Sequence, residues 1–226
     1  MTIARRVSEV APLPAVEFPA RKPMQDRSRA SFERMLAAAE TLLIQRGSDD
    51  FTLIEVSQLG GVSIGSIYNL FKGKDMLIMA VQSRAMERLE ADQALTIMRA
   101  RSRSHTLPEL VQTLVDDLAE FLKTNAPLMR PMMLRAAFDP AVQGRGAAAH
   151  HKMVESLVGE LLGLRDSFRH SDPERAARSV VRIAYATFAR ELGFGMSEEP
   201  ISDAVWSELK EDVGQMAVAF LMSEQP

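Results

Sequence analysis

The stretch Val62–Lys74, with the sequence VSIGSIYNLFKGK, reads as a short helix and governs how the rest of the chain is interpreted. Gly65 lies near its start, although alanine there would stabilise a helix by about 1 kcal/mol. At about 100° per residue, the apolar Ile67 and Phe71 share one side, and Tyr68 lies away from them. Because a glycine allows close approach to the helix backbone, the pattern indicates one buried side and one side that meets another molecule.

A second short helix precedes this one, and together they predict a helix-turn-helix unit. Thr52-Leu-Ile-Glu55 is a capping box that starts the earlier helix, and Gly60-Gly61 ends it. Helices this short do not fold alone, so both must pack against the helices that flank them. The second helix of such a unit typically enters the DNA major groove. A purely structural helix-turn-helix remains the alternative on this pattern alone.

The remainder of the chain also reads as helices, so the predicted fold class is all-α. Residues 1–25 are rich in proline and lack periodicity, which is typical of a flexible tail. Residues 26–75 form the predicted helix-turn-helix domain, and residues 76–226 form a C-terminal helical bundle. We expect a loop at Gly144 and Gly146. The periodic segments and their start and stop signals predict helices in this bundle over 75–99, 106–125, 128–138, 147–164, 172–193 and 202–222.

The composition limits the function classes. The 226 residues are 46% hydrophobic and 25% charged, with a net charge of −3, which is ordinary for a soluble protein. No apolar run approaches the ~20 residues that span a bilayer. The absence of cysteine removes disulfides, thiolate nucleophiles and thiolate metal sites. We therefore expect a cytoplasmic protein without a membrane, metal or cofactor partner.

No motif in the sequence predicts an enzyme. Gly73-Lys74 is followed by Asp75, where a phosphate-binding loop requires serine or threonine. The adjacent His150 and His151 would point about 100° apart on a helix and would not easily share a metal ion. Catalysis is therefore not expected.

Residues 28–77 resemble the DNA-binding domain of TetR-type transcriptional regulators. The family's alanine-containing first helix corresponds to Met35–Ala39, and Gly47 ends that helix. The threonine-capped second helix corresponds to Thr52–Gly61. The most characteristic part of the family's pattern corresponds to Gly61–Lys74 almost without a gap. It begins with Gly-Val-Ser, a variable residue, Gly, a small residue and an aliphatic residue. Tyr, two variable residues and Phe follow, and then a lysine opens the next helix.

The resemblance implies a homodimer that binds a palindromic double-stranded DNA operator and a small-molecule ligand. A repressor released by its ligand is the expected function. A transcriptional activator of the same family, or a helical small-molecule-binding or interaction protein with a structural helix-turn-helix, are the alternatives. The implied base contacts come from Ser63, Ile64, Gly65 and Ser66. The implied phosphate contacts come from Thr52, Tyr68 and Lys74, and Asn69 could contact either bases or phosphates.

Methionines in the C-terminal bundle suit an adaptable apolar binding surface, although methionine is also a common core residue. We expect an apolar or amphipathic ligand, with Arg130 or Arg135 available for an acidic group. The expected ligand-binding side chains are Phe121, Met129, Met132, Met133, Phe138, Tyr185 and Phe188.

The last helix carries apolar residues at steps of three and four, which is typical of a helix-packing seam. The family resemblance implies dimerisation through the last two helices. The expected interface residues are Val181, Phe188, Leu209, Val213, Met216 and Phe220.

Overall fold

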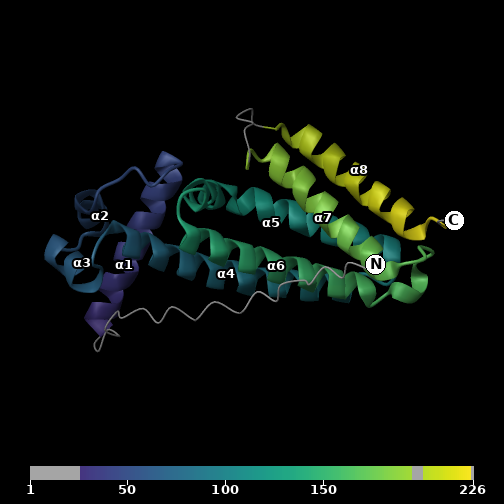
Figure 1. The fold of residues 1–226 in the computed structure, drawn as a ribbon, viewed down its shortest axis with the longest axis horizontal. Helices are drawn as coiled ribbons and strands as arrows, with labels where there is room; N and C mark the ends of the chain where they lie inside the picture. The colour runs from purple at the N-terminus through teal and green to yellow at the C-terminus, as the bar shows by residue number, and fades with distance from the viewer. Residues whose placement is uncertain (1–25, 195–200, 225–226) are drawn as a thin grey trace, which may run out of the picture.

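The computed structural model describes residues 26–194 and 201–224, and the predicted N-terminal tail lies outside this part of the chain. The described residues form helices and no strands, which confirms the all-α class (Figure 1). In chain order the elements are α1 (Asp26–Arg46), α2 (Leu53–Gly60), α3 (Ile64–Leu70), α4 (Lys74–Arg103), α5 (Leu107–Ala136), α6 (Pro140–Leu162), the 3-10 helix η1 (Arg165–Ser167), α7 (Pro173–Glu191) and α8 (Asp203–Met222).

A compact unit at one end of the molecule holds α1, α2 and α3 (Figure 1). The capping box predicted at Thr52 and Glu55 starts α2, and Gly61 ends it in the left-handed conformation, with φ 58°. At Gly60 an added Cβ would lie 3.1 Å from the main-chain oxygen of Arg34, so glycine allows α1 and α2 to approach closely. The core of this unit also takes side chains from α4 and α5, among them Leu77, Val81 and Met132.

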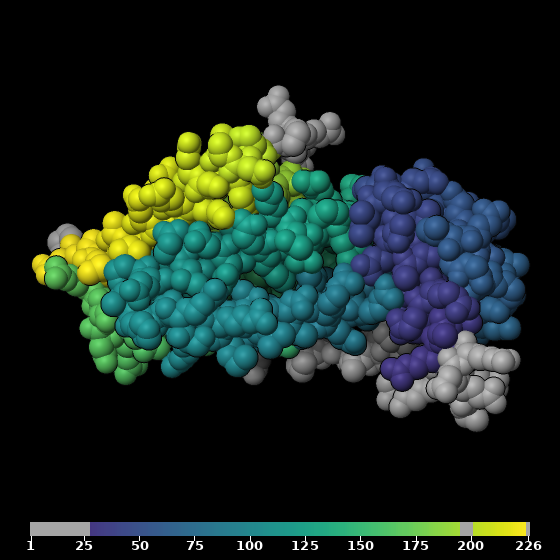
Figure 2. All heavy atoms as spheres, turned by 180° about the vertical axis from the view of Figure 1, so that it is seen from behind, coloured from purple at the N-terminus to yellow at the C-terminus, as the bar shows by residue number. Residues whose placement is uncertain are grey.

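The other helices form an elongated bundle. Helices α4 and α5 leave the helix-turn-helix unit side by side with α6, and α7 and α8 lie along one flank (Figure 1). Seen from behind, the helix-turn-helix unit occupies one end of the molecule and α8 follows the edge of the bundle (Figure 2). A second buried core, centred on Leu118, Leu157, Phe188 and Trp206, holds the bundle together.

Helix α5 continues through the break predicted near residues 126–127. Pro127 and Pro131 lie inside it, although each proline removes one backbone hydrogen bond. The buried apolar face is nevertheless continuous from Leu122 through Ala126 to Met132. The free energy gained by burying that face outweighs the hydrogen bonds lost at the two prolines, so α5 is a single helix. The prediction of two separate helices is wrong.

Helix α6 begins earlier than predicted, and Gly144 and Gly146 lie within it rather than in a loop. The carboxylate of Asp139 caps the helix by accepting hydrogen bonds from the amides of Ala141 and Val142, at 3.0 and 3.2 Å. The cap and the burial of Val142 outweigh the low helix propensity of two glycines, about 1 kcal/mol each.

Candidate nucleic-acid interface and ligand cavity

The packing of α3 determines which of its sides is exposed. Ser63 caps the helix by accepting a hydrogen bond from the amide of Ser66 at 3.1 Å. Ile67 is fully buried, and the ring of Phe71 stacks on Phe32 with centroids 5.8 Å apart. These inward contacts leave Tyr68 pointing outward with 60% of its surface exposed.

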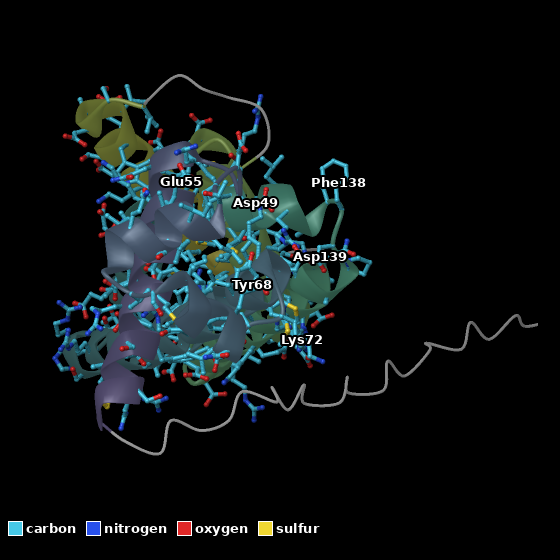
Figure 3. The ribbon with its side chains drawn as sticks, turned by 90° about the vertical axis from the view of Figure 1, so that its left-hand side faces the viewer. Asp49, Glu55, Tyr68, Lys72, Phe138 and Asp139 are labelled. Atoms are coloured by element: carbon cyan, nitrogen blue, oxygen red, sulfur yellow. The ribbon has the colours of Figure 1, made fainter. Side chains whose placement is uncertain are left out.

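The outward side of α3 is open and small near its start. A Cβ added at Gly65 would meet only the Ser63 hydroxyl oxygen, at 4.0 Å, so a partner could approach the backbone there. Tyr68 and Lys72 lie at the end of the molecule that faces the viewer in Figure 3. We call the following residues the reading face, since the structure brings them together on this side: Ser63, Ile64, Gly65, Ser66, Tyr68 and Asn69. Their contact with DNA stays a prediction.

Two residues predicted to contact phosphates, Lys74 and Thr52, also form hydrogen bonds within the protein. The ammonium of Lys74 donates to the main-chain oxygen of Asp49 at 2.6 Å and lies 5.3 Å from the centre of the Phe51 ring. The amide and hydroxyl of Thr52 donate to one carboxylate oxygen of Glu55, at 2.7 and 2.9 Å. These bonds from Thr52 lower the pKa of Glu55. Glu55 therefore stays ionised at the start of α2, where it also forms an ion pair with Arg46.

Lys72 is exposed beside the reading face, and it was not among the predicted contacts. The signal was present in the sequence, since Lys72 follows Phe71 directly where the chain leaves α3. The preference for Lys74 came from the family resemblance, and only the tertiary contact with Asp49 shows that its charge turns inward.

A cavity of about 370 Å³ opens between α4, α5, α6 and α7. This volume is in the range of small-molecule sites. Its wall is mainly apolar, with five methionines at Met86, Met129, Met132, Met133 and Met153. Of the predicted ligand-binding residues, the structure brings five to this wall: Phe121, Met129, Met132, Met133 and Tyr185.

The other two predicted ligand-binding residues lie elsewhere. Phe188 is fully buried in the bundle core, with its ring centre 5.3 Å from that of Trp206. Phe138 lies just beyond α5 and is 86% exposed. The two arginines suggested for an acidic group are also engaged, because Arg130 donates twice to the carbonyl of Leu192 and Arg135 contacts three aspartates.

The polar part of the cavity wall carries little charge. Gln82 is almost fully buried; its amide donates to the carbonyl of Val142 at 3.0 Å and accepts from Arg145 at 2.8 Å. Burial and the neighbouring His151 lower the pKa of His150, whose ring packs on Tyr185 at 4.3 Å. None of the described lining residues is a lysine or an arginine. Nothing in the sequence singled out Gln82, because its role depends on contacts 60 residues away.

Three predicted interface residues lie inside a single subunit. Val181, Phe188 and Val213 retain at most 5% of their surface and belong to the bundle core. The predicted seam on α8 exists, but it packs on α5 of the same chain. At Gly214 an added Cβ would lie 2.0 Å from the side chain of Gln112 on α5. The interface prediction is therefore corrected for these three residues.

The outer surface of α7 and α8 nevertheless carries exposed apolar side chains. Met216 is 62% exposed, Ile183 on α7 is 61% exposed, and Val205 is 51% exposed. Leu209 and Phe220 are partly buried against the bundle core. Among the predicted interface residues, Met216 thus has the largest exposed fraction.

The comparisons with known proteins agree with this geometry. Residues 35–81 match the family model described as bacterial regulatory proteins, tetR family. The matched range runs from the first helix through the reading face into α4. Residues 35–81 therefore form a tetR-type DNA-binding domain.

Solved structures share the TetR fold over most of the chain. A regulator from Mesorhizobium loti MAFF303099 assigned to this family is 20% identical, with a TM-score of 0.66 over 87% of this chain and 98% of its own. The fatty acid degradation regulator FadR from Bacillus halodurans is 14% identical, with a TM-score of 0.62 over 83% and 94%. GusR from Salmonella enterica is 20% identical, with a TM-score of 0.61 over 84% and 95%. No curated protein matches the sequence.

Within the part of the chain that the structure describes, no helix combines the length and apolarity needed to cross a membrane. The same residues contain no cluster of three or more histidine, aspartate or glutamate side chains placed to hold a metal ion.

Proposed function

We propose that the protein is a homodimeric repressor that leaves its operator when a small molecule enters the cavity. The observation that carries the proposal is the reading face, an exposed, glycine-containing side of α3 on a TetR-type domain. Each subunit would place one reading face in the major groove of one half-site of a palindrome, with half-sites about one helical turn apart.

The proposed ligand is an apolar or weakly polar molecule without a strong negative charge. Methionines give the cavity wall an adaptable surface. A carboxylate would need a cation or several donors to offset its desolvation, and the cavity wall offers neither a lysine nor an arginine. Gln82, Gln93 and His150 supply neutral hydrogen-bonding groups that could orient a polar end of the ligand.

A helical small-molecule-binding protein that keeps a structural helix-turn-helix is the competing function. The outward side of α3 argues against it. A helix that only filled the fold would gain from alanine at Gly65, and space for the methyl group is available there. An activator of the same family differs only in where its operator lies, so the geometry does not separate it from a repressor.

Selection of bound duplexes from a random DNA pool tests the proposal. We expect a palindrome with two half-sites and affinity that falls steeply with salt, since counterions are released at each phosphate contact. A Gly65→Leu variant, which blocks close approach to the backbone, should lose selection while keeping its helical circular dichroism. Recovery of no preferred sequence by the parent protein would refute the proposed function.

A further inference from the structure

The last two turns of α5 belong both to the helix-turn-helix unit and to the ligand cavity. Leu128 and Met132 complete the buried core of the former and also line the cavity. Met133 and Ala136, in the same turns, line the cavity as well. A molecule in the cavity therefore presses on side chains that support the reading face.

Arg135 lies within these turns and joins three elements of the fold. Its guanidinium donates to Asp49 in the α1–α2 connection at 2.5 Å, to Asp75 in the first turn of α4 at 2.9 Å, and to the α6 cap Asp139 at 3.0 Å. Figure 3 shows Asp49 and Asp139 on the side where the helix-turn-helix unit meets α5 and α6. The side chain of Arg135 is only 15% exposed, and those of Asp139 and Asp49 are 21% and 36% exposed, so solvent screens these two contacts less than the one with Asp75, which is 76% exposed.

The chemistry of this contact is specific to arginine. Burial alone would lower the pKa of Arg135, but the hydrogen bonds to Asp75, Asp139 and Asp49 raise it overall, so the group stays charged. A planar guanidinium offers five donors in a fixed geometry, whereas lysine is a single point charge. Asp49 is held twice, because its main-chain oxygen also accepts from Lys74.

Two prolines weaken the helix here, since Pro127 lies just before these turns and Pro131 lies within them. Pro127 and Pro131 lack amide hydrogens, so the carbonyls of Lys123 and Pro127 have no helical donor. Helices bend most readily at such positions. The segment that carries Met132, Met133 and Arg135 is therefore held to the rest of α5 by fewer hydrogen bonds than an ordinary helix end.

We propose that Arg135 is the positioning residue that fixes the helix-turn-helix unit against the cavity helices, and that an occupant of the cavity releases the unit by displacing the end of α5. This proposal rests on the proposed function, because release of the unit matters only if the protein binds DNA. The position of the helix-turn-helix unit can be measured without DNA or ligand, so this proposal and the operator selection can fail independently.

Distance measurements between two spin labels test the positioning. The chain has no cysteine, so cysteines introduced at the exposed Gln58 on α2 and Asp166 in η1 take the labels selectively. Labelled chain is diluted with unlabelled chain so that only distances within one subunit are recorded. We expect one narrow distribution for the parent and a broader or shifted one for Arg135→Met. A parent-like distribution for Arg135→Met overturns the proposal.

Matched variants separate positioning from stability. Arg130→Met removes the hydrogen bonds to Leu192 from the same helix, and it should leave the distribution narrow even if it lowers the melting temperature. Asp75→Ala removes only one of the three partners, a carboxylate that is 76% exposed. It should fold and broaden the distribution partially, so the test survives if Arg135→Met does not fold. An unchanged distribution for Asp75→Ala would contradict the proposal in that case.

A tryptophan that fills the cavity serves as a fixed occupant. Ala147 and Ala148 are both exposed on α6, but only Ala147 belongs to the cavity wall, so a large side chain there can enter the cavity from its rim. Ala147→Trp should broaden the distribution as Arg135→Met does, and adding it to Arg135→Met should change little more. Ala148→Trp should match the parent. If Ala147→Trp keeps the narrow distribution of the parent, the cavity is not coupled to the helix-turn-helix unit.

Discussion

At the scale of single residues, Lys72 and Lys74 stand two positions apart but have different surroundings. Lys72 is exposed beside the reading face, and Lys74 is bonded to Asp49 over the Phe51 ring. We expect Lys72→Ala to weaken binding to all DNA sequences about equally. It should reduce the salt slope by about 2, since each subunit of the proposed dimer loses one phosphate contact. Titrations of a palindromic and a scrambled duplex at several salt concentrations measure both effects.

Lys74→Ala is the control for this prediction. It removes an internal hydrogen bond and a cation–π contact, so it should lower the melting temperature of the protein. Its salt slope should stay close to that of the parent. A salt slope reduced by about 2 in Lys74→Ala, but unchanged in Lys72→Ala, would restore the assignment that the family resemblance implied.

Ser66 is predicted to read a base rather than a phosphate. Its hydroxyl lies 2.7 Å from that of Ser63, so the pair is already ordered on the reading face. Ser66→Ala should change the preference at one base position, by up to about 1–3 kcal/mol if the contact is complete. Equal losses on every sequence tested would show that Ser66 does not contribute to specificity.

At the scale of elements, an ion-pair cluster joins α1 to α4. Glu40 is 13% exposed and accepts hydrogen bonds from Arg84 at 2.6 Å and Arg88 at 2.9 Å. Burial raises the pKa of Glu40, but the two arginines outweigh that effect and the pKa falls below its usual 4.5. The stabilisation is therefore complete above pH 4.5, and it is lost as the pH falls through the pKa of the folded state.

Comparison with Glu40→Gln isolates this contribution. At pH 7 we expect the variant to lose about 2 kcal/mol of unfolding free energy, since hydrogen bonds to a charged group are replaced by neutral ones. The difference between parent and variant should shrink as the pH falls below 4.5. Urea unfolding at pH 7 and at acidic pH provides the measurement. A difference that did not depend on pH would contradict the assignment to the carboxylate.

At the scale of the whole molecule, we expect the proposed dimer to form through the exposed apolar surface of α7 and α8. Met216→Glu would place a carboxylate from each subunit in a two-fold interface, and unpaired buried charge is strongly destabilising. We expect a folded monomer that binds the operator weakly, because the effective concentration of the second reading face is lost. Sedimentation and operator titration measure the two effects on one sample.

Val213→Glu should behave differently, since Val213 lies inside one subunit. A carboxylate there should unfold the bundle rather than separate two folded subunits, and circular dichroism distinguishes these outcomes. If Met216→Glu remains dimeric with normal operator affinity, the interface lies on another surface.

Ligand and operator should oppose each other reciprocally. Once an inducing compound is found, saturating operator must weaken its binding by the factor by which the compound weakens operator binding. Driving the protein from about 1% to about 99% released requires roughly a 10⁴-fold preference for the released state. Calorimetry of the compound with and without operator checks this. A compound whose affinity the operator leaves unchanged is not the effector.

The sequence by itself determined where several helices begin and which side of α3 is buried. Capping residues at Thr52, Ser63 and Ser202 mark where helices begin, and the structure confirms all three caps. Periodicity separated Ile67, which is buried, from Tyr68, which is exposed. These features depend on interactions between residues a few positions apart, so a sequence shows them directly.

Only the tertiary structure decided which partner each buried side meets. The apolar residues around Val213 recur with helical periodicity, which shows that this side of α8 is buried. Periodicity does not show whether it packs against α5 of the same chain or against a second subunit. Continuous burial keeps α5 helical past Pro127, and the inward turn of Lys74 depends on a contact 25 residues away. The cavity and the Arg135 junction arise in the same way, because both are made by side chains from helices far apart in the chain.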